Sequence, residues 1–482
     1  MTTLSARTRS ASVWSLLGQL SLNGLRFVSF LVAPFFLKPS DYGVFGYSLI
    51  LVMLFQLVVE TAIPLAIVQS ARTDSELFLT GLTANFLFAI LSYSSLCLLA
   101  DPAAHFLGDA AIQHLIPIMG VQVLFGSLYS IPMALMRRDL DFRRLFVVRL
   151  FGSIPSVLLT IALAVTGFGY WALVVGWLSG GLAQLICSFS LSRVPTPTRV
   201  SRSIFLELMR FSRWVMIDVT ANWGWEYSGG FLVGAALGVS ALGKFRLADQ
   251  AIRSLCAAVL DPLSPVVFSA LSTLNRDGRD LSAPLKQMNY VFGTISIPLI
   301  FLIALIAYPG AAILGPKWSG LATVLVLDGI AWGLNYLIQA VPQYFRAVGR
   351  PALVVMIRLP MALVQLLCLA VAVTGGLRAF LFTRIILEIV MVLVFAFVVA
   401  HKFKVNLFRQ LSRHLATAVI NAGFLAIAYL LGKAVSNLGL ALHVLTEITS
   451  FVSLSFMFSL RDENSYAYHL KHVIRRRFGQ SA

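Results

Sequence analysis

Charged residues are scarce in this sequence. Asp, Glu, Lys and Arg make up 12% of its 482 residues, about half of the roughly 25% that is usual in soluble globular proteins. Hydrophobic residues make up 59%. The longest polar stretches, 192–213 and 275–287, are too short to fold as domains outside a membrane. These absences exclude a soluble globular protein and a separate soluble catalytic domain within this sequence.

Catalytic and metal-binding patterns are also missing. The four cysteines lie in apolar stretches without metal-ligand spacing, the seven histidines are scattered, and there is no glycine-rich phosphate loop. We therefore expect no metal, no cofactor and no enzymatic activity. The enzyme alternative is a membrane polysaccharide polymerase or glycosyltransferase. Such enzymes usually carry a large extracytoplasmic loop, whereas the gap 101–111 here holds only 11 residues.

Long hydrophobic stretches follow one another along the whole chain. About fourteen of them are long enough to cross a hydrocarbon core of about 30 Å as a helix. Stretches such as 418–431 lack the polar alternation of a transmembrane β-barrel strand. The sequence therefore predicts an all-α polytopic membrane protein. The stretches are 12–36, 44–68, 77–100, 112–136, 146–166, 170–191, 214–237, 245–270, 288–308, 321–345, 352–374, 379–400, 415–431 and 440–460.

Lys and Arg are divided unevenly between the gaps that separate these stretches. Of the 37 cations, 26 lie in the tails and the even-numbered gaps and only five in the odd-numbered gaps. Cytoplasmic loops are enriched in Lys and Arg, so both termini are expected in the cytoplasm. The net charge of +17 is then explained by loops that face anionic membrane lipids, and not by nucleic acid. The remaining six arginines lie inside the predicted spans. Of these, Arg149 is expected to be an anchor at the membrane interface, because it follows a basic loop, and Arg384 is expected to pair with Glu388 four residues further on.

Two turns that are 200 residues apart suggest an internal duplication. Residues 38–45 and 238–245 each place a glycine and then an aromatic at the entry to the next stretch. Residues 164–167 and 372–375 repeat the tetrapeptide Ala-Val-Thr-Gly. A repeat of six spans keeps its orientation in the membrane, which predicts two pseudosymmetric parallel six-helix lobes with alternating access between them.

The repeat also sets the expected domain limits. They are an N-terminal lobe at 12–191, a cytoplasmic linker at 192–213, a C-terminal lobe at 214–400, two extra C-terminal helices within 412–460 and a basic cytoplasmic tail at 461–482.

Particular residues in both halves resemble a known family, the polysaccharide-transport branch of the MOP flippase superfamily. The resemblance covers about residues 12–400. In the first half it is carried by Trp14, Gly18, the turn 39–43, Pro64 and Gln69, and in the second by the turn 237–245 with Asp249 and Gln250.

The resemblance implies a function. It implies a carrier in the bacterial inner membrane that flips a polyprenyl-diphosphate-linked oligosaccharide from the cytoplasmic to the periplasmic leaflet. Such carriers serve the assembly of exopolysaccharide, capsule or O-antigen. It also implies a central, often cationic cavity, coupling to an ion gradient, and a polysaccharide polymerase and export machinery as partners.

Arg26 is the first candidate for binding an anionic head group. It lies about midway along the first stretch, and Asn23 shares its helical face. A charge at this depth is costly unless it faces water or a partner. The alternative role is a buried ion pair with Glu60 or Glu226, the latter being the repeat equivalent of Arg26.

Two further arginines are candidates for the same role. Arg253 lies four residues after Asp249, so the two can pair along one helix or leave the guanidinium to a diphosphate. Arg358 lies in the stretch 352–374 and is expected to line the cavity.

Acidic residues inside the spans are candidates for ion coupling, because a buried carboxylate can carry a proton or bind sodium. The candidates are Glu60, Asp218, Glu226 and Asp249, with Asp328 as a further buried acid. The transporter alternative, a multidrug or cation antiporter of the same superfamily, would favour an acidic cavity. Counts of charged residues do not separate the two, and the resemblance favours polysaccharide transport.

Overall fold

The computed structural model describes Leu25 and residues 32–70, 75–139, 141–192, 199–350, 352–434 and 440–461. Within these ranges every element is a helix and no strand occurs. Only helices and closed barrels satisfy all backbone hydrogen bonds in lipid. The all-α architecture predicted from the sequence is therefore confirmed.

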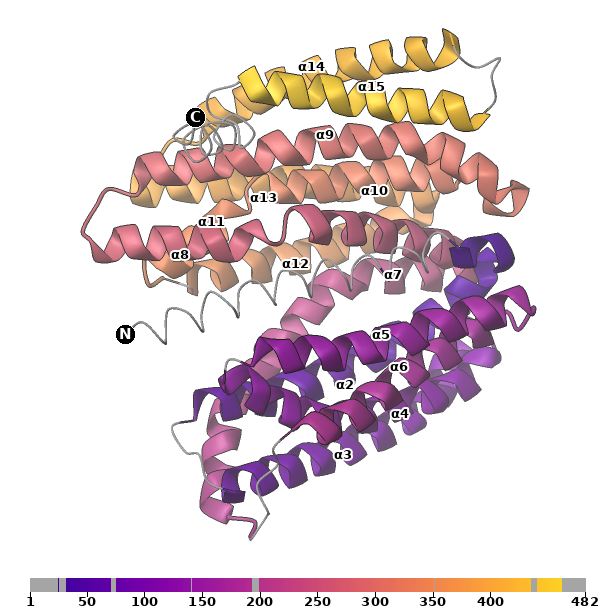
Figure 1. Ribbon diagram of the computed structural model, residues 1–482, viewed down its shortest axis with the longest axis vertical. Coiled ribbons are helices and arrows are strands. Elements are labelled where there is room, and N and C mark those ends of the chain that lie inside the picture. Colours follow the sequence, from indigo (N-terminus) through magenta and orange to yellow (C-terminus); the bar gives the residue numbers. More distant parts are fainter. Residues whose placement is uncertain are drawn as a thin grey trace, which may run out of the picture. The chain divides into compact units, whose positions relative to one another are not determined.

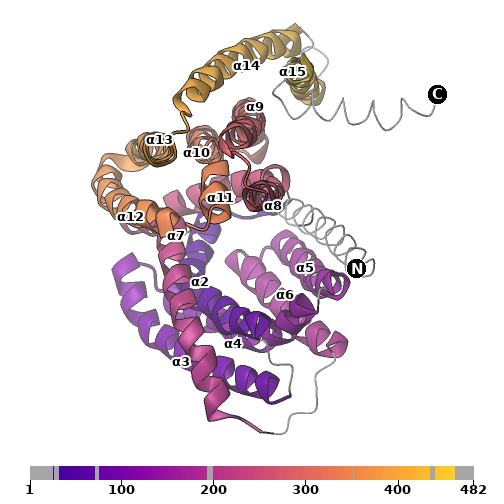
Figure 2. The same cartoon turned by 90° about the vertical axis from the view of Figure 1, so that its left-hand side faces the viewer.

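The chain divides into two compact units, Met1–Leu247 and Ala248–Ala482. The first unit contains α2 (Pro39–Gln69), α3 (Ser75–Leu107), α4 (Ala111–Arg138), α5 (Phe142–Val165), α6 (Tyr170–Leu191) and most of α7 (Arg202–Val259). Within it α5 lies beside α6, and α4 contacts both α2 and α3 (Figures 1 and 2). The division falls inside α7, whereas the repeat in the sequence suggests the loop before residue 214.

The second unit begins in the last turns of α7. It continues with α8 (Leu263–Arg276), α9 (Ser282–Leu314), η1 (Pro316–Trp318), α10 (Leu321–Tyr336), α11 (Ala340–Ala347), α12 (Ala352–Ala372), η2 (Val373–Gly375), α13 (Gly376–Phe403), α14 (Phe408–Ala434) and α15 (Leu440–Arg461). Helix α10 packs between α9 and α13, and α14 and α15 pair with each other and with α9 (Figure 2).

Eleven stretches of the described residues are long and apolar enough to cross a membrane. Two of them, Arg202–Cys256 and Ala352–Phe403, hold 55 and 52 residues, about twice what one crossing needs. The first contains the predicted span 214–237 and the beginning of 245–270, and the second contains the predicted spans 352–374 and 379–400. Counted in this way, the described residues hold thirteen of the fourteen predicted spans, and the first falls almost wholly outside them.

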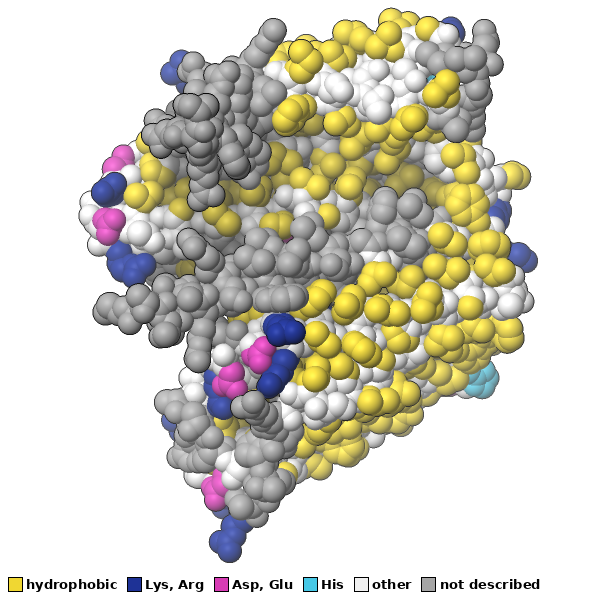
Figure 3. All heavy atoms as spheres, in the orientation of Figure 1, with side chains coloured by type: hydrophobic (Ala, Val, Ile, Leu, Met, Phe, Trp, Pro, Cys, Tyr) yellow, Lys and Arg dark blue, Asp and Glu magenta, His cyan; other side chains and the backbone are white. Residues whose placement is uncertain are grey.

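Side chains on the surface differ between the lengths of the helices and their ends. Hydrophobic side chains cover the lengths of α5 and α9, and charged side chains gather where α5 begins and at the turn between α8 and α9 (Figure 3). These two charged ends belong to gaps that the distribution of Lys and Arg assigns to the cytoplasm.

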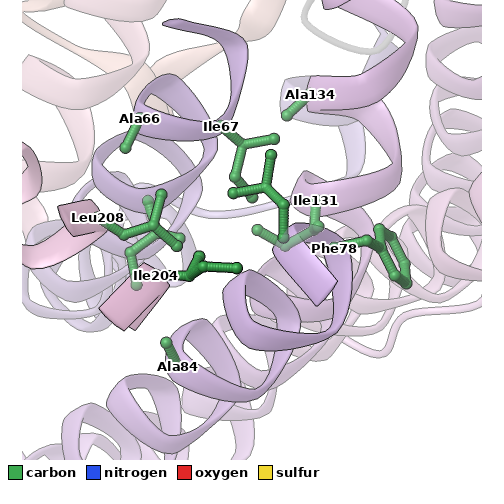
Figure 4. Packing of buried hydrophobic residues seen from close by; sticks show 10 residues of the cluster. Ala66, Ile67, Phe78, Ala84, Ile131, Ala134, Ile204 and Leu208 are labelled. Atoms are coloured by element: carbon green, nitrogen blue, oxygen red, sulfur yellow. The ribbon is translucent and has the colours of Figure 1, made fainter. Parts of the chain in front are cut away.

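A buried hydrophobic cluster holds the start of α7 against the N-terminal helices. Ile67 of α2, Phe78 of α3 and Ile131 of α4 converge on Ile204 and Leu208 of α7 (Figure 4). The predicted cytoplasmic linker 192–213 is therefore helical from Arg202 onward.

The two glycine turns of the sequence repeat lie in contact with each other. The Cα of Gly43 faces the backbone carbonyl of Val239, and that of Gly243 faces the carbonyl of Pro39 and the amide of Gly43. Any Cβ at either glycine would overlap backbone. Helix α7 is interrupted at Gly238, which adopts φ 82° and ψ 173°, a conformation that glycine reaches without strain. This close approach gives the repeated glycines a structural role.

Two predicted spans of the second unit are broken. The sequence predicts that Asp261 and Pro262 end a helix, and α7 does end at Val259, but α8 resumes at Leu263. The predicted span 321–345 is likewise divided between α10 and α11. The Tyr336 hydroxyl, in the last residue of α10, donates to Asp261 at 2.7 Å and so connects the two breaks. Discontinuous helices expose backbone groups and are typical of transporter binding sites.

We expect Gly43→Ala and Gly243→Ala each to lower the free energy of unfolding by about 1–3 kcal/mol, the range for overpacking a tight contact. Reversible unfolding of the purified protein in mixed micelles, followed by circular dichroism, measures this. Gly224→Ala is the control, because a Cβ on this glycine of α7 meets no neighbour. Equal stability of all three variants would contradict the close approach.

Candidate functional site

Four of the residues proposed from the sequence do not lie in a described buried site. Asn23 and Arg26 fall outside the described residues, so their role stays a prediction. Asp218 and Glu226 lie on α7 and are exposed. The other candidates fall into two separate polar sites, one in each unit.

The site in the second unit is built around Asp249 near the end of α7. Arg253 Nε donates to Asp249 Oδ2 at 3.1 Å, as the spacing of four residues predicts. The indole of Trp332 on α10 donates to Asp249 Oδ1, also at 3.1 Å, and the guanidinium of Arg384 on α13 approaches the same oxygen to 4.0 Å. One carboxylate thus connects α7, α10 and α13.

Asp328 and Arg384 form the centre of this ion-pair cluster. Asp328 is fully buried and accepts a hydrogen bond from Arg384, while its Oδ2 has no hydrogen-bond partner in the part of the chain that the structure describes. The sequence spacing suggests that Arg384 pairs with Glu388 along α13. The structure places Arg384 against Asp328 of α10. Arg384 also interacts electrostatically with Glu388, which accepts a hydrogen bond from Asn335 at 3.1 Å.

Trp332 and Arg358 complete the cluster. The guanidinium carbons of Arg253 and Arg384 lie 4.8 and 5.6 Å from the Trp332 ring centre, within cation–π range. Arg358 on α12 is close enough to Glu388 for their charges to interact. The negative charges of three acids are therefore balanced by the positive charges of three arginines inside the membrane-length helices. The acids are Asp249, Asp328 and Glu388, and the arginines are Arg253, Arg358 and Arg384.

The site in the first unit is a cavity of about 510 Å³ between α2, α4, α5 and α6. Glu60 of α2 lies in its wall and accepts hydrogen bonds from Gln56 Nε2, at 2.7 Å, and from the Tyr129 hydroxyl of α4. Arg137 and Arg149 also line the cavity and interact electrostatically with Glu60.

Sequence reasoning missed most of this cavity. It identified Glu60 as a buried acid but interpreted Arg149 as an anchor at the membrane interface, because a basic loop precedes it. The structure places Arg149 in the cavity wall. The spacing of four between Gln56 and Glu60 signals one polar face on α2, whereas nothing in the sequence connects that face with Tyr129.

No metal centre is evident in the ranges that the structure describes. No group of three or more His, Cys, Asp or Glu side chains there is arranged to hold an ion.

The fold is shared with solved membrane transporters. The chain superposes on a lipid II flippase in an inward closed conformation with a TM-score of 0.69 and 14% identity, over 96% of this chain and 99% of that one. An inward-facing multidrug resistance transporter of the MATE family and MOP superfamily gives a TM-score of 0.65 and 14% identity, over 81% and 99%. With its many membrane-length helices, the chain has the fold of a multi-pass membrane protein that these solved transporters also adopt.

The chain belongs to the polysaccharide biosynthesis protein family, whose model matches residues 31–323. It is 24% identical to the succinoglycan biosynthesis transport protein ExoT of Rhizobium meliloti (strain 1021) over 352 residues, which cover 73% of this chain and 71% of that protein. The resemblance to the polysaccharide-transport branch of the MOP superfamily is thereby confirmed.

Arg384→Gln is expected to lower the free energy of unfolding by about 3–5 kcal/mol, because it leaves buried Asp328 without its charged partner. Combining it with Asp328→Asn should restore most of this loss. Unfolding of the purified variants in mixed micelles provides the measurement. Arg378→Gln, which removes an exposed cation from the same helix, is expected to change stability by less than about 0.5 kcal/mol. A double variant as unstable as Arg384→Gln would refute the pairing.

Proposed function

We propose that this transporter flips a polyprenyl-diphosphate-linked oligosaccharide from the cytoplasmic to the outer leaflet of the bacterial inner membrane, with both termini in the cytoplasm. The observation that carries the proposal is the family match over residues 31–323. The name of its relative, a succinoglycan biosynthesis transport protein, supports it. Succinoglycan is assembled from sugars, so this name favours a glycan as the cargo over a small cation.

The chemistry of the polar sites agrees with such a cargo. A sugar head group with a diphosphate cannot cross hydrocarbon unaided, because a charge at the bilayer centre costs at least about 3 kcal/mol. Both units offer arginines at membrane depth, and the planar guanidinium fork suits phosphate oxygens. Arg253 and Arg358 in the second unit, with Arg26 and Asn23, are the proposed diphosphate contacts, reached by alternating access between two lobes.

We propose Asp249 as the carboxylate that couples transport to a cation gradient. It accepts from Arg253 and Trp332 and faces Arg384. A proton on Asp249 would weaken its contacts with all three residues at once. A local change of charge would thereby reach three helices, as a conformational switch requires. Glu60, Asp218 and Glu226 are the other candidate acids.

The proposed cellular setting follows from the same chemistry. The basic tail at 461–482 is proposed to bind anionic lipids of the cytoplasmic leaflet. A polysaccharide polymerase and export machinery are the proposed protein partners, since a flipped oligosaccharide must be consumed on the far side of the membrane.

Flipping is tested in proteoliposomes that contain the full-length protein and a fluorescent polyprenyl-diphosphate oligosaccharide. A membrane-impermeant reductant bleaches only dye in the outer leaflet, which is about half of the dye in protein-free vesicles. In vesicles with the protein it should bleach nearly all of the dye, because flipping brings the inner-leaflet lipid to the outer leaflet. A cationic fluorescent drug serves as the second cargo. Movement of the drug without movement of the lipid-linked sugar would favour the multidrug alternative and refute the proposal.

Coupling is tested by imposing a proton or sodium gradient on the same vesicles. The wild-type protein should respond to one of them by at least a several-fold change in net flipping. Asp249→Asn should flip without responding to the gradient, because the amide cannot take up the cation. Asp218→Asn, on the same helix, tests an alternative acid and should keep the response to the gradient. A fully gradient-dependent Asp249→Asn variant would exclude Asp249.

A further inference from the structure

We propose that the cavity of the first unit is a binding site for a sugar that carries a phosphate group. This inference rests on the proposed function and adds a second contact site to the diphosphate contacts proposed above. In the cavity, Glu60, Gln56 and Gln122 would bind the sugar, and Arg137 and Arg149 would bind its phosphate.

The size of the cavity admits such a ligand. Its volume of about 510 Å³ lies within the range of roughly 300–1,000 Å³ that is usual for small-molecule sites. The described residues that line it all come from α2, α4, α5 and α6 of one compact unit.

Two buried acceptors in the wall have no donor among the described residues. Gln56 and Gln122 are 6% and 3% exposed, and no described residue donates a hydrogen bond to the side-chain carbonyl oxygen of either. A buried polar atom without a partner costs about 1–3 kcal/mol. Both residues line the cavity, so these amides lie beside the space that a ligand with hydrogen-bond donors would fill.

The Glu60 carboxylate adds a third group of acceptors beside these amides. It already receives the Gln56 amide and the Tyr129 hydroxyl, which hold it in place. Amide and carboxylate oxygens that converge on one space favour a ligand with several hydroxyl groups, because each hydroxyl donates one hydrogen bond. A sugar ring has this chemistry.

Trp177 provides an apolar surface in the same wall. It lies on α6 and lines the cavity, and Phe45 packs against its ring edge-to-face at 6.4 Å between centroids. A rigid aromatic face can cover the apolar C–H face of a sugar ring. Small-molecule sites typically combine an aromatic surface with a small number of polar groups.

The charges of the wall indicate where an anion would lie. Arg137 and Arg149 outnumber Glu60, and both interact electrostatically with it. This excess of positive charge opposes a bound metal cation and favours an anionic group near the arginines. Guanidinium groups bind phosphate oxygens through paired hydrogen bonds. Together with the acceptors, this describes a sugar phosphate.

Glycines make room for the polar amides. The Gln122 amide lies against Gly181 and the Gln184 amide against Gly152, so that a Cβ at either glycine would overlap the amide. Both glycines belong to the cavity wall. The absence of side chains at these positions of α5 and α6 therefore sets where the amides lie.

The sugar phosphate could reach the cavity as part of a lipid-linked substrate or as a free molecule. The test uses the full-length protein in detergent and measures binding of glucose 1-phosphate, glucose and inorganic phosphate by titration calorimetry. Glucose 1-phosphate should bind more tightly than either component. Gln122→Leu and Arg149→Gln should each weaken its binding about tenfold, the factor expected for one good hydrogen bond.

Gln365→Leu is the matched control. It replaces a buried glutamine of α12 in the second unit and should leave binding unchanged. Melting temperature and elution profile of each variant show whether it is folded. Phosphate binding as tight as that of glucose 1-phosphate would refute the sugar part of the proposal. Two results would refute binding of the free sugar phosphate at this site. One is that the wild type does not bind glucose 1-phosphate, and the other is that the folded Gln122→Leu and Arg149→Gln variants bind it as tightly as the wild type does.

Flipping of the fluorescent lipid-linked oligosaccharide by the same variants separates the two sources. Slower flipping by Gln122→Leu and Arg149→Gln supports a site for the lipid-linked sugar phosphate, with or without binding of the free one. Normal flipping by both variants, with unchanged binding, refutes the site while the proposed function stands. If the wild type binds glucose 1-phosphate but does not flip, the site holds for a free sugar phosphate and the proposed function fails.

Discussion

The cost of an uncompensated charge in hydrocarbon organises the interior of this protein. In the second unit Asp328 is fully buried, and it is tolerable there because Arg384 reaches it from another helix. Asp249 is held in the same way by Arg253 and Trp332. These pairs decide which faces of α7, α10 and α13 meet. In the first unit the same constraint places Glu60 beside a tyrosine, a glutamine and two arginines, around a cavity that remains polar.

Close backbone contact is the second constraint. In a membrane, helices associate through packing, and small residues let their backbones approach. Gly43 and Gly243 do this where α2 begins and where α7 resumes after Gly238. The sequence repeat had marked these glycines only as similar turns. Their mutual contact explains why both positions lack a side chain, which a comparison of the two turns alone does not reveal.

The candidate sites show how far sequence reasoning reaches. The pairing of Asp249 with Arg253 was predictable, because a spacing of four residues places two side chains on one face of a helix. The partner of Arg384 was not, since Asp328 lies 56 residues away and only the packing of α10 on α13 joins them. Arg149 was assigned to the interface because of its basic neighbours, yet it lines a cavity with Glu60. Proximity between helices leaves no local signal in the chain.

The sequence by itself determined the all-α polytopic architecture, nearly all of the spans and the family. Hydrophobic length and the lack of backbone partners in lipid permit few alternatives. Tertiary structure decided which polar residues share a site, where spans break into α7 and α8 or α10 and α11, and that a cavity with unpartnered amide oxygens lies inside the first unit. The physical reason is that local patterns report the surroundings of one helix, whereas a site depends on distances between several.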